Sequence, residues 1–267
     1  MTRKNNAIFY IKVSLIPHWG FMLTQVGATK SRIALRVLPP TTLIGALAYS
    51  LFHDKLPEER VVSSAGKRKG LSIVSAADYL RDVLISVNAK INVPFIRYAD
   101  LSRIFFYDVR RKVLKSDAVA VGKIYTGRGD IRVTYLFDSE LTKEKLGTRW
   151  KEELAVAAMS IVRVGSKESI VSAIRVEYGE AKPVEAREVE TSYYFPSYAA
   201  TPLRGVFSLV NVVDWTKSSI GSYLEAEYTS IVVPYDSASL RVSTVRAKLS
   251  DGVSAYDVGG EIVVPWR

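Results

Sequence analysis

The sequence contains no cysteine, and its 267 residues include only two histidines, His18 and His53. Disulfide bonds and cysteine-ligated metals are therefore excluded, and a reducing, cytoplasmic location is expected. A histidine-rich metal site is also disfavoured, because too few imidazoles are available as ligands. We expect neither a metal ion nor any other cofactor.

Long apolar runs are absent as well, and no segment reaches the ~18 residues that a membrane-spanning helix needs. The first twenty residues, MTRKNNAIFYIKVSLIPHWG, are basic and then apolar, but they lack a small-residue cleavage site. No signal peptide and no membrane partner are predicted.

Acidic residues are scarce relative to basic ones, with 27 Asp and Glu against 37 Lys and Arg, which gives a net charge of +10. Such an excess favours nucleic acid as the partner. Two alternatives stay open: a protein that is simply basic, and one whose charge meets acidic subunits of an assembly.

Motifs of common enzymes are missing too. The stretch GSKES, which begins at Gly165, lacks the G-x-x-x-x-G-K-[ST] spacing of a nucleotide-hydrolysing loop. No G-x-S-x-G elbow occurs, and the acidic residues show no metal-binding spacing. His18, beside Trp19, is a candidate general acid or base, but a histidine next to an aromatic residue is more often structural.

The pattern of the first 180 residues predicts alternating strands and helices. The expected elements are a strand at 8–16, a helix from Thr41 or Thr42 to about His53, a short helix at 76–84, a strand at 85–91, a strand at 133–137, a helix at about 141–162 and a strand at 170–178. Pro39 and Pro40 hold the approach to the first helix extended, and a threonine hydroxyl is expected to cap it. A polar, basic loop is expected at 63–70, SSAGKRKG.

This order matches the split β-α-β-β-α-β arrangement of a ferredoxin-like domain with an insertion. The insertion is expected at Arg103–Arg132, as a protruding hairpin or arm with GRGD as a turn. Beyond residue 180, short β-like runs separated by Pro, Gly and Asp predict a smaller all-β unit. The predicted fold is therefore α+β, with domains at 1–180 and 181–267.

The segment 103–132 interleaves eight basic residues with aromatic ones. Bases can stack on such rings while the cations hold phosphates. For Phe105 and Phe106, however, burial at the base of a hairpin is the favoured interpretation.

Two glycines stand out near the predicted helices. Gly165 lies in RVGSKES, after the second helix, where it permits a tight turn and close approach by another backbone. Ser166, Lys167 and Ser169 could donate to a phosphate there, although a simple helix C-cap is the alternative. Gly45 lies inside the first helix at a cost of about 1 kcal/mol relative to Ala. Close packing of the two helices is favoured over RNA contact as its reason.

Three segments resemble the archaeal branch of CRISPR-associated protein family five, in the RAMP superfamily. They are HWGF at 18–21, LPPTTLIGALAY at 38–49 and RVGSKESIVS at 163–172. The resemblance covers residues 7 to 178 well. It implies a ferredoxin-like (RRM-like) domain with a β-hairpin thumb and a small β-rich C-terminal domain, in a type I-A Cascade complex.

The resemblance also implies partners and a role. The expected partners are the 5′ handle of the CRISPR RNA, target DNA near the protospacer-adjacent motif, the backbone Cascade subunit and the large Cascade subunit. One branch of the family cleaves precursor RNA with tyrosine, lysine and histidine, but no such triad can be placed here. We therefore expect no catalysis, with a metal-independent endoribonuclease and a purely structural assembly protein as the alternatives.

The residues expected to contact RNA combine the basic and glycine-containing segments. They are Arg32, Gly45, Lys67, Arg68, Lys69, Arg103, Arg110, Arg111, Lys112, Lys123, Tyr125, Arg128, Arg163, Gly165, Ser166 and Lys167.

Overall fold

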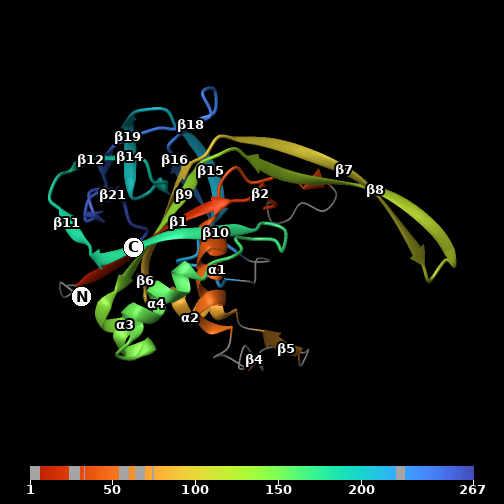
Figure 1. The fold of residues 1–267 in the computed structure, drawn as a ribbon, viewed down its shortest axis with the longest axis horizontal. Helices are drawn as coiled ribbons and strands as arrows, with labels where there is room; N and C mark the ends of the chain where they lie inside the picture. Colours follow the sequence, from red (N-terminus) through yellow and green to blue (C-terminus); the bar gives the residue numbers. More distant parts are fainter. Residues whose placement is uncertain are drawn as a thin grey trace.

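The computed structural model describes residues 7–23, 31–32, 34–53, 60–63, 70–73, 75–220 and 226–267 (Figure 1). The strands up to residue 138 are β1 (Ile8–Pro17), β2 (Gly20–Phe21), β3 (Ser31–Arg32), β4 (Arg60–Ser63), β5 (Gly70–Ile73), β6 (Leu84–Asn92), β7 (Phe95–Asp108), β8 (Val113–Thr126) and β9 (Asp130–Asp138). The later strands are β10 (Val171–Glu180), β11 (Lys182–Val184), β12 (Glu188–Thr191), β13 (Phe195–Pro196), β14 (Ala200–Arg204), β15 (Ser208–Val213), β16 (Tyr228–Val233), β17 (Tyr235–Asp236), β18 (Arg241–Val242), β19 (Val245–Leu249), β20 (Ala255–Asp257) and β21 (Ile262–Val263). The helices are α1 (Pro40–Phe52), α2 (Ala76–Arg81), α3 (Ser139–Leu146) and α4 (Trp150–Met159). The predicted mixture of helices and strands is confirmed.

A four-stranded antiparallel sheet with the order β10–β1–β9–β6 forms the centre of the molecule. Helices α1 and α4 lie on one side of it, and the strands that follow β10 lie on the other (Figure 1). Its four strands correspond to the strands predicted from the sequence in this part of the chain. The short helix predicted at 76–84 is α2, which ends earlier, at Arg81.

Strand β1 is buried on both faces, which explains its nearly continuous apolar sequence. On one face, the Phe9 ring packs edge-to-face with the Trp150 ring of α4, with 4.8 Å between centroids. On the other face, Tyr10 packs in a cluster with Tyr193 and Val263 from the C-terminal strands. The central sheet is therefore sandwiched between helices and a second β layer.

The C-terminal strands form several small antiparallel sheets. Their orders are β12–β19–β14, β13–β16–β15 and β11–β20–β21, and β17 pairs with β18. In the described residues 181–220 and 226–267 there is no helix. Tyr194, Trp215 and Trp266 belong to the same buried cluster as Ile11 and Leu43, so one hydrophobic core runs through both parts of the chain.

An ion cluster around Glu261 ties the C-terminal strands to the central sheet. Its Oε1 accepts hydrogen bonds from Lys90 at 3.0 Å and Arg132 at 3.2 Å, and its Oε2 accepts from Lys12 at 3.1 Å and the Tyr193 hydroxyl at 3.0 Å. Burial acts to raise the pKa of Glu261, but the hydrogen bonds from Lys90 and Lys12 outweigh it and lower the pKa to about 2. The folded state therefore strongly favours the ionised carboxylate.

The start of α1 differs from the prediction. Pro39 is the N-cap and Pro40 the first helical residue, and the N–H groups of Thr42 and Leu43 donate to the Pro39 carbonyl at 3.0 and 3.2 Å. No side chain caps the helix, so the predicted threonine cap is wrong. Proline suits the first helical position because its ring fixes φ and its missing N–H would have no helical partner there. The predicted end at His53 is confirmed by its C-cap position.

The helix predicted at 141–162 is in fact two helices. Asp138 caps α3 by accepting from the N–H groups of Glu140 and Leu141, and α3 ends at Leu146, followed by Gly147 as the C-cap with φ of +87°. The second helix, α4, begins at Trp150, whose side chain is buried. A backbone conformation that favours glycine thus interrupts a continuous apolar periodicity. Among the described residues, no helix has the length and apolar character needed to cross a membrane.

A long hairpin of β7 and β8 projects from the body of the molecule (Figure 1). Its pairing runs from Phe95↔Thr126 to Asp108↔Val113, so the hairpin begins eight residues before the predicted Arg103 and returns at Thr126. The predicted burial of Phe105 and Phe106 is wrong, because their side chains are 64% and 45% exposed. They lie toward the tip, beyond the reach of the core.

Replacing Glu261 by Gln is expected to reduce the free energy of unfolding by about 3 kcal/mol at pH 7, because three cations lose their shared carboxylate. The folded pKa of Glu261 lies below its ordinary value of 4.5, so its contribution is present above that pH and is lost as the pH falls toward 2. Urea denaturation of both proteins between pH 7 and pH 2.5 measures this. A difference between them that stays constant over the whole range would contradict the assignment.

Candidate nucleic-acid interface

The segment between α4 and β10 forms a tight loop. The Val164 N–H donates to the Ser169 carbonyl at 3.0 Å, and the Ser169 N–H donates to the Ser166 carbonyl at 3.0 Å. Gly165 has φ of +93°, a conformation that side chains other than hydrogen rarely tolerate. The predicted tight turn at Gly165 is confirmed.

The neighbour of Gly165 is a side chain and not a backbone. A Cβ atom at this position would lie 2.4 Å from Leu23 Cδ2 and 3.6 Å from Thr42 Cγ2. The expected close approach by another backbone is therefore wrong. Instead, Gly165 lets the loop pack onto Leu23 and the first turn of α1, which brings the loop and the helix into one surface.

The loop presents fewer hydrogen-bond donors than its sequence suggests. Ser169 is buried, its Oγ accepts from the Met22 N–H at 3.0 Å, and it lies 3.0 Å from the Ser166 Oγ. Ser169 is therefore unavailable to a phosphate, and the Ser166 hydroxyl is already hydrogen-bonded to the Ser169 hydroxyl. Lys167 is exposed and, within the described part of the chain, makes no ion pair.

Helix α1 adds an open face beside this loop. A Cβ atom at Gly45 would meet nothing within 4 Å, so the predicted close packing of the two helices at this glycine is wrong. One turn later, the exposed Tyr49 ring lies 5.4 Å from the Arg163 guanidinium and stacks on His53 at 5.7 Å. Gly45, Tyr49 and Arg163 thus form a cationic and aromatic surface with free space in front of the helix.

Trp19 connects this loop with the root of the hairpin. Its Nε1 donates to the Glu168 carbonyl at 2.5 Å, and its ring lies 5.7 Å from the Tyr125 ring of β8. Tyr98 of β7 lies on the other side of Tyr125, at 5.9 Å. Lys123, opposite Tyr98, forms an ion pair with Asp100 at 2.9 Å, and this hydrogen bond raises the pKa of Lys123.

The tip of the hairpin is built around Asp108. Its carboxylate accepts from the N–H groups of Arg110 and Arg111 at 3.1 Å each and from Lys115 Nζ at 2.7 Å. The hydrogen bond from Lys115 lowers the pKa of Asp108. Lys112 completes the turn with φ of +52°. The side chains of Arg110, Arg111 and Lys112 are exposed, and none of them pairs with an acid in the part of the chain that the structure describes.

The other predicted RNA contacts lie apart or outside the described residues. Arg128 is exposed in the turn between β8 and β9, and Arg103 is exposed midway along β7. The backbone of Arg32 in β3 pairs with Val121 of β8, but the Arg32 side chain lies outside the described part of the chain. Lys67, Arg68 and Lys69 also lie outside the described residues.

Four residues of this surface were not predicted from the sequence: Trp19, Tyr49, His53 and Tyr98. Tyr49 follows Gly45 by four residues and His53 follows Tyr49 by four, which places all three on one helix face. That spacing was available in the sequence. The stacking of Trp19 and Tyr98 on Tyr125 depends on the register of the hairpin, which the sequence does not display.

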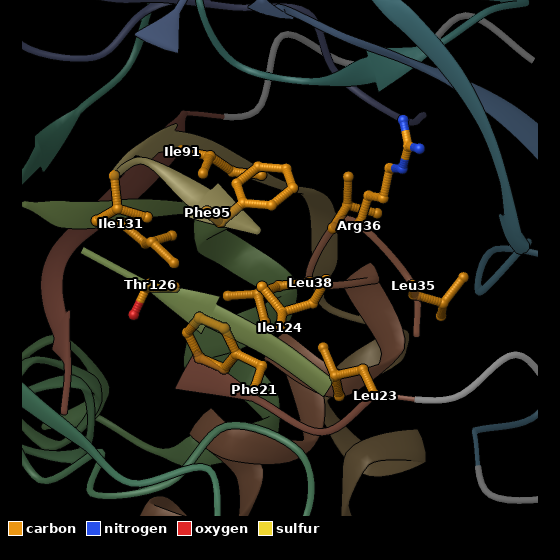
Figure 2. Close-up of a pocket in the computed structure, with 12 residues that line it drawn as sticks. Phe21, Leu23, Leu35, Arg36, Leu38, Ile91, Phe95, Ile124, Thr126 and Ile131 are labelled. Atoms are coloured by element: carbon orange, nitrogen blue, oxygen red, sulfur yellow. The ribbon is translucent and has the colours of Figure 1, made fainter. Parts of the chain in front are cut away.

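An apolar cavity lies at the root of the hairpin (Figure 2). Phe21, Phe95, Ile124 and Ile131 face one another there, whereas the Arg36 guanidinium points away from them (Figure 2). The space open to a water-sized sphere is about 20 Å³, close to that of a single water molecule. The cavity therefore belongs to the packing of the root and cannot admit a nucleotide.

The candidate histidine has one hydrogen-bond partner for its ring among the described residues. His18 is exposed, and its Nε2 lies 2.8 Å from the Ser172 hydroxyl, the one hydrogen bond that its ring makes with described residues. Among the described residues, no three His, Asp or Glu side chains gather as a metal site would require.

Comparisons with known proteins point to one family. No family model matches the sequence. Two proteins of Saccharolobus solfataricus, CRISPR-associated protein Cas5 3 and CRISPR system aCascade subunit Cas5 1, are each 31% identical to the chain over 265 residues, covering 96% of this chain and 99% of the relative. A crystal structure of a CRISPR protein from Archaeoglobus fulgidus superposes with a TM-score of 0.60 at 18% identity, covering 97% of this chain and 99% of that one, which shows a shared fold.

The two glycines are expected to respond in opposite directions to substitution by Ala. Gly45→Ala adds a methyl group to open space within a helix and should raise stability by about 1 kcal/mol. Gly165→Ala forces a positive φ and a clash with Leu23, so it should lower stability by about 1–2 kcal/mol or more. Thermal melting of the two variants measures both effects, and destabilisation by Gly45→Ala would contradict the open face.

Proposed function

The chain belongs to the Cas5 family of CRISPR-associated proteins, and we propose that it is the non-catalytic RNA-binding subunit of a type I-A Cascade complex. In this proposal it binds the 5′ handle of the CRISPR RNA and caps the filament of backbone subunits. Its other partners are the large Cascade subunit and target DNA near the protospacer-adjacent motif.

One observation carries the proposal: exposed cations and aromatic rings follow one another from α1 to the tip of the hairpin. Arg163 lies against Tyr49, Trp19 links the loop to Tyr125, and the hairpin continues outward to its basic tip. Cations hold phosphates and rings stack on unpaired bases, so this combination suits single-stranded RNA. The net charge of +10 also favours binding to RNA, because RNA is a polyanion.

The strand order supports a finer assignment of the fold. The central sheet runs β10–β1–β9–β6, with α1 and α4 as the two crossover helices, which is the arrangement of a ferredoxin-like domain. We assign residues 1–180 to this domain and 181–267 to a β-rich domain. The hairpin of β7 and β8, inserted between β6 and β9, takes the role of the thumb.

The open face at Gly45 supports a contact with another molecule. A glycine inside a helix is unfavourable, and here no packing within the described chain requires it. An RNA backbone or a neighbouring subunit that lies against α1 would require it. The stability gain expected for Gly45→Ala should therefore be accompanied by weaker binding to the RNA or to the neighbouring subunit, whichever lies against α1.

Recognition of the handle is tested by binding. The full chain should bind a labelled CRISPR repeat-spacer RNA more tightly than an RNA of the same length with a scrambled handle. Replacing Arg110, Arg111 and Lys112 by Ala should lower the slope of log affinity against log salt by about 2, since each phosphate contact contributes about 0.7 on a single strand. The melting temperature should stay unchanged, because the three side chains are exposed.

The outcomes of that experiment separate the alternatives. Equal affinity for both RNAs would argue against handle recognition. A large fall in melting temperature on the triple substitution would make the tip part of the fold. Assembly with partner subunits that survives ribonuclease treatment, without bound RNA, would favour a purely structural role.

The absence of catalysis is a separate prediction. Purified protein incubated with repeat RNA in EDTA is expected to leave the RNA intact, because His18 has only a serine hydroxyl as its partner among the described side chains. Denaturing gel electrophoresis measures cleavage. Products that form in EDTA and disappear with His18→Ala would establish a metal-independent endoribonuclease instead.

A further inference from the structure

The two faces of the β7–β8 hairpin carry different charges. Residues opposite each other in an antiparallel pair project from the same face, and successive residues alternate between faces. One face, here called the arginine face, carries Arg97, Ala99, Leu101, Arg103, Phe105 and Tyr107 of β7, opposite Ile124, Gly122, Ala120, Ala118, Ser116 and Leu114 of β8. The other, here called the lysine face, carries Ile96, Tyr98, Asp100, Ile104, Phe106 and Asp108, opposite Tyr125, Lys123, Val121, Asp117, Lys115 and Val113.

The cations of the lysine face are already neutralised. Lys115 pairs with Asp108 at 2.7 Å, and Lys123 pairs with Asp100 at 2.9 Å. A third carboxylate, Asp117, lies on the same face. Its two lysines thus meet three aspartates, and a phosphate that approached this face would have to break an existing ion pair and face a surplus of negative charge.

The cations of the arginine face have no such partners. Arg97 and Arg103 are exposed, their cross-strand neighbours are Ile124 and Ala118, and neither arginine pairs with an acid among the described residues. No acidic residue lies on this face of either strand. Both guanidinium groups are therefore free to make bidentate contacts with phosphates.

The shape of the arginine face also suits an extended strand of nucleic acid. On β8, the residues opposite Leu101, Arg103 and Phe105 are small: Ala120, Ala118 and Ser116. The larger side chains of β7 therefore lie beside a row of small side chains on β8. The rings of Phe105 and Tyr107, which are 64% and 56% exposed, lie at the end of this row nearest the tip of the hairpin.

We infer that single-stranded nucleic acid lies along the arginine face, with phosphates on Arg97 and Arg103 and bases stacked on Phe105 and Tyr107, while the lysine face makes no phosphate contact. The inference rests on the proposed RNA-binding function and adds Arg97 to its site. It also removes Lys123, whose charge is taken by Asp100. The tip residues Arg110, Arg111 and Lys112 then continue the phosphate-binding surface from the arginine face to the end of the hairpin.

Two double variants of the full chain test the charges. Arg97→Gln with Arg103→Gln and Lys115→Gln with Lys123→Gln each remove two positive charges from the same hairpin, one pair from each face. Binding to a labelled CRISPR repeat-spacer RNA is measured between 50 mM and 400 mM salt. The arginine pair should lower the salt slope by about 1.4, from two contacts at about 0.7 each, and the lysine pair should leave the slope unchanged.

Two neighbouring phenylalanines provide a matched test of stacking. Phe105→Ala removes a ring from the arginine face, and Phe106→Ala removes one from the lysine face. Loss of a stacked base contact should weaken binding about fivefold or more for Phe105→Ala. Phe106→Ala should change the affinity less than twofold. Equal melting temperatures for the two variants exclude unequal folding as the cause.

The outcomes distinguish this inference from the proposed function. If the wild-type chain shows no salt-dependent binding to the RNA, the proposed function fails. If the wild type binds and the lysine pair or Phe106→Ala weakens binding as much as its counterpart, the proposed function stands and the assignment of faces is overturned. Selective loss with the arginine pair and Phe105→Ala supports the inference.

Discussion

The last pair of the β6–β9 ladder, Asn92↔Asp130, fixes where the hairpin leaves the central sheet. The Asn92 Nδ2 donates to Asp130 Oδ1 at 3.0 Å, which closes the ladder with a side-chain hydrogen bond. Because β6 and β9 are neighbours in the sheet, the chain that connects them must leave and re-enter the sheet at the same end. A long connection of this kind that consists of β-favouring residues forms a two-stranded antiparallel ribbon.

Three further hydrogen bonds and one ring stack hold the root of that ribbon in place. The Phe95 N–H donates to the Tyr235 hydroxyl at 3.2 Å, and the two rings stack at 4.5 Å. The Gly127 N–H donates to the Pro94 carbonyl at 2.8 Å, and the Thr126 N–H donates to the Trp19 carbonyl at 2.9 Å. The C-terminal strands, through Tyr235, thus help to orient an element that lies more than a hundred residues earlier in the sequence. Tyr235 also belongs to the buried cluster that contains Ile11 of the central sheet and Leu43 of α1.

Structural features that depend on residues close together in the sequence were predicted well, whereas features that depend on tertiary packing were not. The strands at 8–16 and 170–178 and the turn at Gly165 follow from local pattern and from glycine chemistry. The start of the hairpin was missed because residues 95–102 contain a single arginine, and the change in composition begins only at Arg103. Gly45 could not be interpreted from the sequence, since open space beside a helix is a property of the whole fold.

Burial of large apolar residues is a sound expectation for a compact domain, and it fails most strongly in the hairpin. Leu101, Val109 and Leu114 are 75%, 77% and 72% exposed, and the rings of Phe105 and Tyr107 are open as well. Covering a side chain of this size contributes about 1.5–3 kcal/mol, so leaving five of them in water is a substantial disadvantage for the isolated chain. An exposed apolar ribbon of this kind marks a binding surface. Its anchored root keeps the ribbon extended before a ligand arrives, so binding can cover these side chains without first having to order the strands that carry them.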